Sequence, residues 1–277
     1  MDFYQKEKES FIMNYIWKEW LEQSRGKGLW LGLAMVMLTS IFLLMEARSY
    51  PDELGFDAFL LSLYDMNIYL VPIFALFISS FSIYQEKELK TSMILLTKKE
   101  SNRSLMLKKS VAIQTVVIGV FVGWYFVLAI AMKWFLQFQL TSFIYFLVTV
   151  VVLLFIFNQL GLFLGNMANT KMQLIGATIF TWFLFVFLID LAFIQYVPSV
   201  SYENVTLFSW LYFLDPLHTL RFFLETSLGL FSLNNMSRLM EKMIWMAPWK
   251  FLLIDLAFWM ILFFELAILF RSKGEKS

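Results

Sequence analysis

The sequence contains no cysteine, and its 277 residues include a single histidine, His218. The lack of cysteine excludes disulfide bonds, thiolate metal sites and a cysteine nucleophile. A lone histidine with no second ligand near it in the sequence is more often a polar surface residue than a metal ligand. We therefore expect no metal site and no resident cofactor in this chain.

The sequence also lacks the Walker A pattern G-x-x-x-x-G-K-[ST], whose backbone amides cradle nucleotide phosphates. The chain therefore cannot bind ATP by that route, and we expect it not to be an enzyme. Its 22 Lys and Arg nearly balance its 21 Asp and Glu, and the basic residues are spread along the chain rather than gathered in one patch. This pattern does not favour a nucleic-acid partner.

Charged residues make up only 16% of the chain, whereas hydrophobic residues make up 60%. So apolar a sequence cannot bury its side chains in a water-facing globule, and its solvent must include lipid. A helix that crosses the hydrocarbon core of a bilayer needs about 20 apolar residues. The sequence therefore predicts an all-α membrane protein with six transmembrane helices, at residues 28–45, 67–83, 111–132, 143–164, 174–194 and 249–270.

The distribution of Lys and Arg predicts how these spans are oriented, because cytoplasmic loops carry an excess of basic residues. The N-terminal arm (residues 1–27) has five, segment 84–110 has seven, the connection after the fourth span has one and the C-terminal tail has three. These sixteen of the 22 basic residues fall on one side, so both termini are expected in the cytoplasm. The first span follows a long polar arm without a cleavage pattern and is expected to be retained.

Residues 9–23 repeat at helical spacing, with Trp17 and Trp20 on the apolar face and Lys18 and Glu19 on the polar face. Tryptophans on an apolar face are typical of a helix that lies in the headgroup region. We expect this interfacial helix either to anchor the chain or to form part of a docking surface.

Segment 84–110 is the most basic interruption between two apolar runs, yet it carries an apolar cluster at residues 93–96. A cytoplasmic element that is moved by a soluble motor protein needs both features. Its apolar cluster must dock onto the motor protein, and its charges must keep it out of the lipid. The alternative is an ordinary basic inner loop, which would need neither the length nor the apolar cluster.

Three carboxylates lie inside predicted spans: Asp190 and Asp255 near the outer ends of spans five and six, and Glu265 nearer the inner end of span six. An intramembrane carboxylate costs a few kcal/mol or more unless it faces a partner or a wet cavity, so each is a candidate functional residue. Arg221 is a plausible partner for Asp190. The alternatives are snorkelling to the interface for the two aspartates, and an end-of-helix charge near Arg271 for Glu265.

Two connections on the predicted outer side differ in character. Residues 46–66 carry five carboxylates and are expected to form a solvated loop. Residues 195–248 are too long for a turn, and their apolar run at 205–214 is too short for a seventh span, so a helical outer loop is expected. Within span four, Gly161 and Gly165 have the small-xxx-small spacing that permits close helix packing, either inside one chain or between two copies.

The order of residues in segment 84–110 resembles the E-x-E-x-G-T-L-x-L-L signature of ABC-2 type permeases. The resemblance assigns docking onto an ATPase to Glu86, Glu88, Thr91, Met93, Leu95 and Leu96. Lys90 replaces the usual Gly, Ser92 the usual Leu and Lys99 the usual Pro.

Further stretches are similar to one branch of that family, the permease subunit of the nitrous-oxide-reductase maturation transporter. They are residues 18–21, residues 182–191 with Asp190, and residues 210–221 with Asp215 and Arg221, where Asp215 occupies a position that is usually Asn. The resemblance covers most of the chain in order.

The resemblance implies a permease in the bacterial cytoplasmic membrane that pairs with a second copy of itself and two ATPase subunits, which hold ATP and magnesium. It also implies an extracytoplasmic β-helical partner and delivery of a sulfur species or copper-related cargo. A generic exporter of lipid, peptide or drug stays open, as does a non-transporting scaffold. An ion-coupled carrier is disfavoured because the sequence shows no duplicated, Gly/Pro-broken spans.

Overall fold

The computed structural model of the chain describes residues 2–47, 55–89, 102–232 and 236–274. These residues form helices and turns and include no strand. The helices are α1 (Asp2–Arg25), α2 (Lys27–Ala47), α3 (Gly55–Glu88), α5 (Asn102–Phe135), α6 (Leu140–Met167), α7 (Lys171–Phe183), a π-helical turn η1 (Leu184–Leu188), α8 (Ile189–Tyr196), a 3-10 turn η2 (Val197–Ser199), α9 (Val205–Tyr212), α10 (Pro216–Ser227), α11 (Arg238–Met243) and α12 (Pro248–Gly274).

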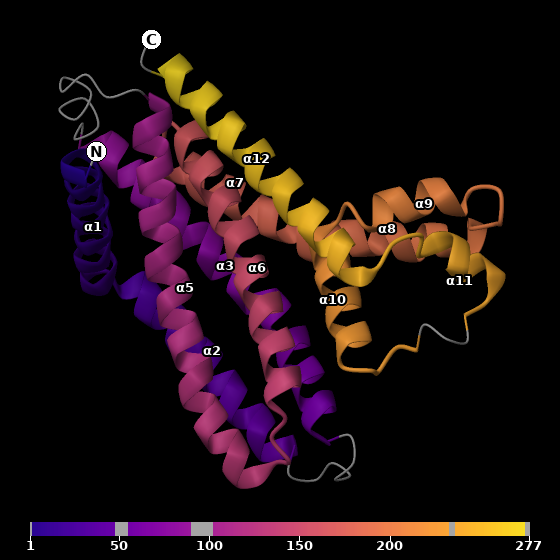
Figure 1. Ribbon diagram of the computed structural model, residues 1–277. Coiled ribbons are helices and arrows are strands. Elements are labelled where there is room, and N and C mark those ends of the chain that lie inside the picture. Colours follow the sequence, from indigo (N-terminus) through magenta and orange to yellow (C-terminus); the bar gives the residue numbers. More distant parts are fainter. Residues whose placement is uncertain (1, 48–54, 90–101, 233–235, 275–277) are drawn as a thin grey trace.

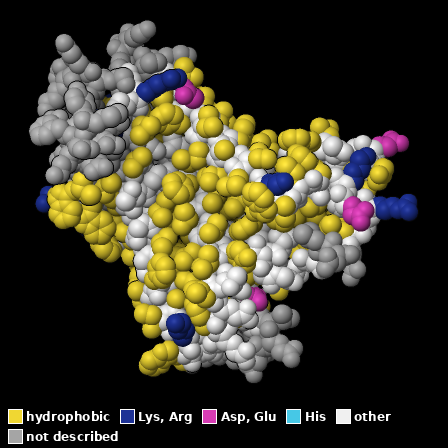
Figure 2. All heavy atoms as spheres, viewed as in Figure 1, with side chains coloured by type: hydrophobic (Ala, Val, Ile, Leu, Met, Phe, Trp, Pro, Cys, Tyr) yellow, Lys and Arg dark blue, Asp and Glu magenta, His cyan; other side chains and the backbone are white. Residues whose placement is uncertain are grey.

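Six helical stretches in the described part are long and apolar enough to cross a bilayer, which indicates a multi-pass membrane protein. The predicted all-α class and the predicted number of spans are therefore confirmed. Apolar side chains cover much of the helix surface that Figure 2 shows, and charged side chains are few. A water-facing protein could not leave so large an apolar surface uncovered.

The second span begins earlier than the sequence predicted. Helix α3 starts at Gly55 rather than at residue 67, and Asp57 and Asp65, expected in a solvated loop, lie within it. Asp65 pairs with Arg221 from α10 at 3.6 Å, which explains why the helix tolerates its charge. Asp57 is 9% exposed, in the first turn of α3. Part of the expected loop, residues 48–54, lies outside the described residues.

Helices α3 and α6 form the centre of the bundle, with α2 against α3 and α12 against α6 (Figure 1). Helix α1 packs along α5 at the end of the bundle where both chain termini lie, called the terminal end below. At this end, Lys87 donates hydrogen bonds to the carbonyl oxygens of Asn166 (3.2 Å) and Ala168 (3.0 Å), which ties the end of α3 to the end of α6.

The close packing of α6 on α3 depends on two glycines. A Cβ atom on Gly161 would lie 2.8 Å from the carbonyl oxygen of Leu76, and one on Gly165 would lie 2.6 Å from that of Ser80. Neither backbone oxygen can move without shifting α3. The small-xxx-small pair therefore serves packing within one chain.

Polar side chains inside the bundle bond to one another across helices. Ser79 of α3 donates to Asn158 of α6 at 2.7 Å, and Asn158 donates to Gln114 of α5 at 3.1 Å. Ser110 of α5 donates to Gln159 of α6 at 2.6 Å. Since unpaired polar groups are costly in an apolar interior, these bonds favour one register among the three helices.

Between α7 and α12 the chain forms a helical arm that comprises α8, η2, α9, α10 and α11 (Figure 1, right). Residues 205–212 form the short helix α9 rather than a span. The π-helical turn η1 connects α7 to α8 and offsets the helix by an extra residue just before Asp190.

Candidate functional site

A group of four charged residues, the terminal ion cluster, joins three helices at the terminal end. Lys109 of α5 lies 2.5 Å from Glu19 of α1 and 3.0 Å from Glu86 of α3. Lys18 of α1 lies 2.9 Å from the same oxygen of Glu86. Two lysines thus face two glutamates within the cluster, and the partly exposed Glu22, 3.4 Å from Lys18, adds a third carboxylate at its edge.

The centre of this cluster is buried. The side chains of Lys109 and Glu19 are each 1% exposed, and Glu86 is 7% exposed. The remaining acceptor oxygen of Glu19 takes hydrogen bonds from Ser82 (2.7 Å) and Gln23 (2.8 Å). A buried ion pair is tolerated when its charges are matched and its oxygens are bonded, and removing one member typically costs 3–5 kcal/mol, roughly.

Helix α1 turns a charged side chain inward and an indole outward, which corrects the expected division of its faces. Glu19 was expected on a solvated face but lies inside the protein, and Trp17 remains 63% exposed. Trp20 is partly buried and lines a groove against α5. Burial alone would lower the pKa of Lys18, but the charge and hydrogen bond of Glu86, aided by Glu22, outweigh burial and raise it.

The terminal ion cluster brackets the segment for which motor docking was predicted. Glu86 lies near the start of segment 84–110 and Lys109 near its end, so both ends of the segment attach to α1 through one set of ion pairs. Glu88 is exposed at the end of α3. The other predicted docking residues, Thr91, Met93, Leu95 and Leu96, lie outside the described residues.

Glu265 lies at the same end of the molecule, as a partly exposed charge on the last part of α12. It accepts a hydrogen bond from Arg103 of α5 at 2.9 Å, with both side chains substantially exposed. Arg271, its expected neighbour, instead approaches the sulfur of Met106 at 3.2 Å. These contacts attach the last part of α12 to the start of α5.

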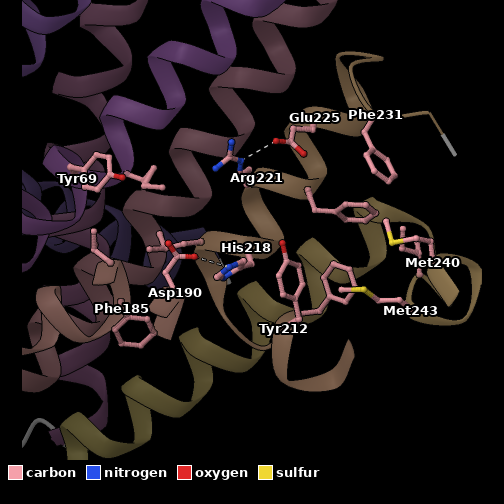
Figure 3. A pocket seen from close by; sticks show the side chains of 16 residues that line it. Tyr69, Phe185, Asp190, Tyr212, His218, Arg221, Glu225, Phe231, Met240 and Met243 are labelled. Atoms are coloured by element: carbon pink, nitrogen blue, oxygen red, sulfur yellow. Dashed lines mark hydrogen bonds and ion pairs between the residues drawn. The ribbon is translucent and has the colours of Figure 1, made fainter. Parts of the chain in front are cut away.

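A second polar region, the arm pocket, lies between η1–α8 on one side and α9, α10 and α11 on the other (Figure 3). It is a cavity of about 330 Å³. Its polar wall contains Asp190, Tyr212, His218, Arg221 and Glu225, and aromatic rings and methionines complete the lining.

Local sequence explains how the polar wall is held. Asp215 caps the N-terminus of α10, accepting the backbone amide of His218 at 3.1 Å, and Pro216 occupies the first helical position. The same Asp215 carboxylate also binds Nδ1 of His218. Nε2 of His218 then lies 3.4 Å from Asp190. His218 is only 14% exposed, so it is not the surface residue that the sequence suggested.

Arg221 does not form the predicted ion pair with Asp190. Its guanidinium bonds Glu225 one turn along α10 at 2.9 Å and lies 3.6 Å from Asp65 of α3. Asp190 is paired with His218 instead, although Asp190 and Arg221 line the same cavity. The spacing of charges along the sequence could not distinguish the two pairings.

Asp255 lies under the arm and is 4% exposed, which excludes snorkelling to the membrane surface. Asp215 is likewise 4% exposed. Within the described part of the chain, Oδ1 of each carboxyl group accepts no hydrogen bond. No group of three His, Asp or Glu among the described residues is placed to hold a metal ion.

Sequence reasoning missed several members of both sites. Lys109 looked equivalent to its neighbour Lys108, and neither Asp65 nor Glu225 was singled out. The partners of Lys109 and Asp65 lie far away in the sequence, and Asp65 itself lies on a helix that begins earlier than predicted. No local signal therefore marks these two residues. A carboxylate four residues after Arg221 is the one usable hint, because that spacing pairs side chains on a helix.

Comparison with known proteins finds no family model that matches this sequence and no curated protein that is similar to it.

Proposed function

We propose that this chain is the membrane subunit of an ATP-driven transporter, moved by a separate ATPase. The observation that carries the proposal is the terminal ion cluster, which fastens α1 to the helices entering and leaving segment 84–110. A force applied to that segment would therefore reach three helices together. An ordinary inner loop has no need for such a buried connection.

The sequence supports the same direction of energy flow. The chain contains no Walker A pattern, so a nucleotide-driven cycle would need another polypeptide. Sixteen of the 22 Lys and Arg residues belong to sequence segments expected on one side of the membrane, which favours a cytoplasmic position for both termini. The resemblance of residues 86–97 to the ABC-2 permease signature supplies the type of motor.

In the proposed cycle, two copies of the chain form a pathway and each docks one ATPase, which holds ATP and magnesium. Closure of the ATPase pair would move α1, α3 and α5 as one body. Helix α6 follows α3, because Gly161 and Gly165 leave no gap between the two helices. Such a coupled movement is a two-state element that ATP binding can bias, as alternating access requires.

The proposed cargo follows from the narrower resemblance: a sulfur species or a copper-related cargo for maturation of nitrous-oxide reductase, received outside the bacterial cytoplasmic membrane by a β-helical protein. A generic exporter of lipid, peptide or drug is the alternative within the same mechanism. A non-transporting scaffold is the alternative outside it.

Purification of the full chain in mild detergent, with identification of co-purifying chains, tests the proposal. We expect an ATPase chain in equal amount. Cells that carry an ATPase-inactive partner should then lose function although the complex still assembles. A scaffold predicts that function survives that inactivation, and the absence of any ATPase chain would contradict the proposal.

A further inference from the structure

The arm pocket carries an excess of negative charge. Of the residues that line it, Asp190 and Glu225 are acidic and Arg221 is the permanent cation, which leaves a net charge of −1 while His218 is neutral. Asp65 and Asp215 lie outside the lining, where Asp65 shares the charge of Arg221 and Asp215 binds the ring of His218.

The one permanent cation of the pocket is already neutralised. Arg221 bonds Glu225 at 2.9 Å and faces Asp65 at 3.6 Å, so its charge is shared between two carboxylates. Asp190, by contrast, has only a 3.4 Å contact with His218, and its side chain is 57% exposed. Its carboxylate is therefore available to a ligand on the cavity side.

Tyr212 stands beside these carboxylates in the polar wall of the pocket. Burial raises the pKa of Tyr212 to about 12, and the carboxylates of Glu225, Asp215 and Asp190 act in the same direction against Arg221. In Figure 3 the Tyr212 ring stands between His218 and Met243, with its hydroxyl on the side of Arg221. The phenol therefore stays neutral and adds no charge to the pocket.

The rest of the lining suits an apolar body attached to a positive charge. Rings of Tyr69, Phe185, Phe222 and Phe231 surround the cavity beside Tyr212. Aromatic faces attract organic cations by roughly 0.5–2 kcal/mol each when the site is desolvated. A volume of about 330 Å³ lies at the lower end of the range typical of small-molecule sites.

We propose that the arm pocket binds a small organic cation with an aromatic or aliphatic body, such as a quaternary ammonium, between the carboxylates of Asp190 and Glu225. An anionic ligand would meet the same carboxylates and be repelled. A neutral ligand would leave the negative excess uncompensated. A metal ion lacks a set of three ligands in the described part of the chain.

The test uses the full chain in micelles of the uncharged detergent dodecyl maltoside, titrated with benzyltrimethylammonium and observed by saturation-transfer NMR. Its neutral isostere neopentylbenzene, in which carbon replaces the ammonium nitrogen, is the matched comparison. Signals from protein-free micelles are subtracted for both compounds. We expect saturable binding of the cation, at least tenfold tighter than that of the isostere. Equal affinity for the two compounds would overturn the proposal.

Two variants locate the site. Asp190→Asn and Glu225→Gln should each weaken binding of the cation about tenfold while affinity for the isostere stays the same, since one full charge is removed at unchanged shape. Glu203→Gln, on an exposed turn of the same arm outside the pocket, is the control and should change nothing. Wild-type affinity in both pocket variants would overturn the proposal. The comparison of the two compounds on the unmodified chain decides the question even if a variant fails to fold.

This inference goes beyond the proposed transport function and is separable from it, because cation binding needs no ATPase. A chain that binds the cation but never associates with an ATPase would refute the transporter proposal and leave the pocket in place. An ATPase complex without cation binding would do the reverse.

Discussion

Replacing Lys109 with Met removes the shared cation of the terminal ion cluster without changing the length of the side chain much. Glu19 and Glu86 would then remain buried, and only the half-exposed Lys18 would be left to offset two negative charges. Breaking a buried ion pair by removing one partner costs about 3–5 kcal/mol. We expect a loss of that size in the free energy of unfolding.

Lys108→Met is the matched control, since it removes the same charge one residue earlier on the same helix. Lys108 is only partly buried, so we expect a cost below about 1 kcal/mol. The double variant Lys109→Met/Glu19→Gln should recover part of the loss, because it also removes one of the stranded carboxylates.

Denaturant titration of the full chain in mixed micelles measures the free energy of unfolding. The absence of natural cysteine allows a second readout: in a Ser82→Cys background the thiol lies under Glu19 and should be protected from a maleimide until α1 detaches. Lys109→Met should speed labelling of this thiol, and Lys108→Met should not. Equal stability and equal labelling rates in the two variants would refute the claim that the terminal ion cluster holds α1 against α3 and α5.

Two further predictions concern packing and surface charge. Gly165→Ala should destabilise the bundle by about 1–3 kcal/mol, because its Cβ would lie 2.6 Å from the carbonyl oxygen of Ser80. Gly176→Ala is the control and should cost nothing, because no atom lies within 4 Å of the added Cβ. The difference in melting temperature between the two alanine variants measures the effect. Arg103→Gln should lower the free energy of unfolding by at most about 1 kcal/mol in denaturant titration, because the ion pair of Arg103 with Glu265 is exposed. A larger loss would contradict the assignment of this pair as a weak surface contact.

The sequence predicted the membrane class and the six spans because long apolar runs need no knowledge of what packs against them. It misplaced the start of α3, because Asp57 and Asp65 resemble loop residues until their cover and their partner Arg221 are known. Helical periodicity placed Glu19 on a polar face, and only the position of Lys109, ninety residues later, explains why that face is buried.

The two candidate sites show the same limit. Glu86, Lys18 and Glu19 were singled out before the structure was known, but the lysine that joins them was not. In the arm, Asp190 and Arg221 were named, yet Asp190 contacts His218 of α10, and Arg221 bonds Glu225 on its own helix and faces Asp65 of α3. Charge type can be read from a sequence, whereas pairing between distant segments depends on the packing of apolar surfaces that bring them together.

The most direct test of the central claim is photocrosslinking from position 95, at the middle of segment 84–110. Benzoylphenylalanine introduced in place of Leu95 in the full chain, irradiated in native membranes, should give a crosslinked product with an ATP-binding subunit, and the same residue at Glu203 should not. The account would be contradicted if position 95 gave no crosslinked product with the ATPase, or if only position 203 gave one.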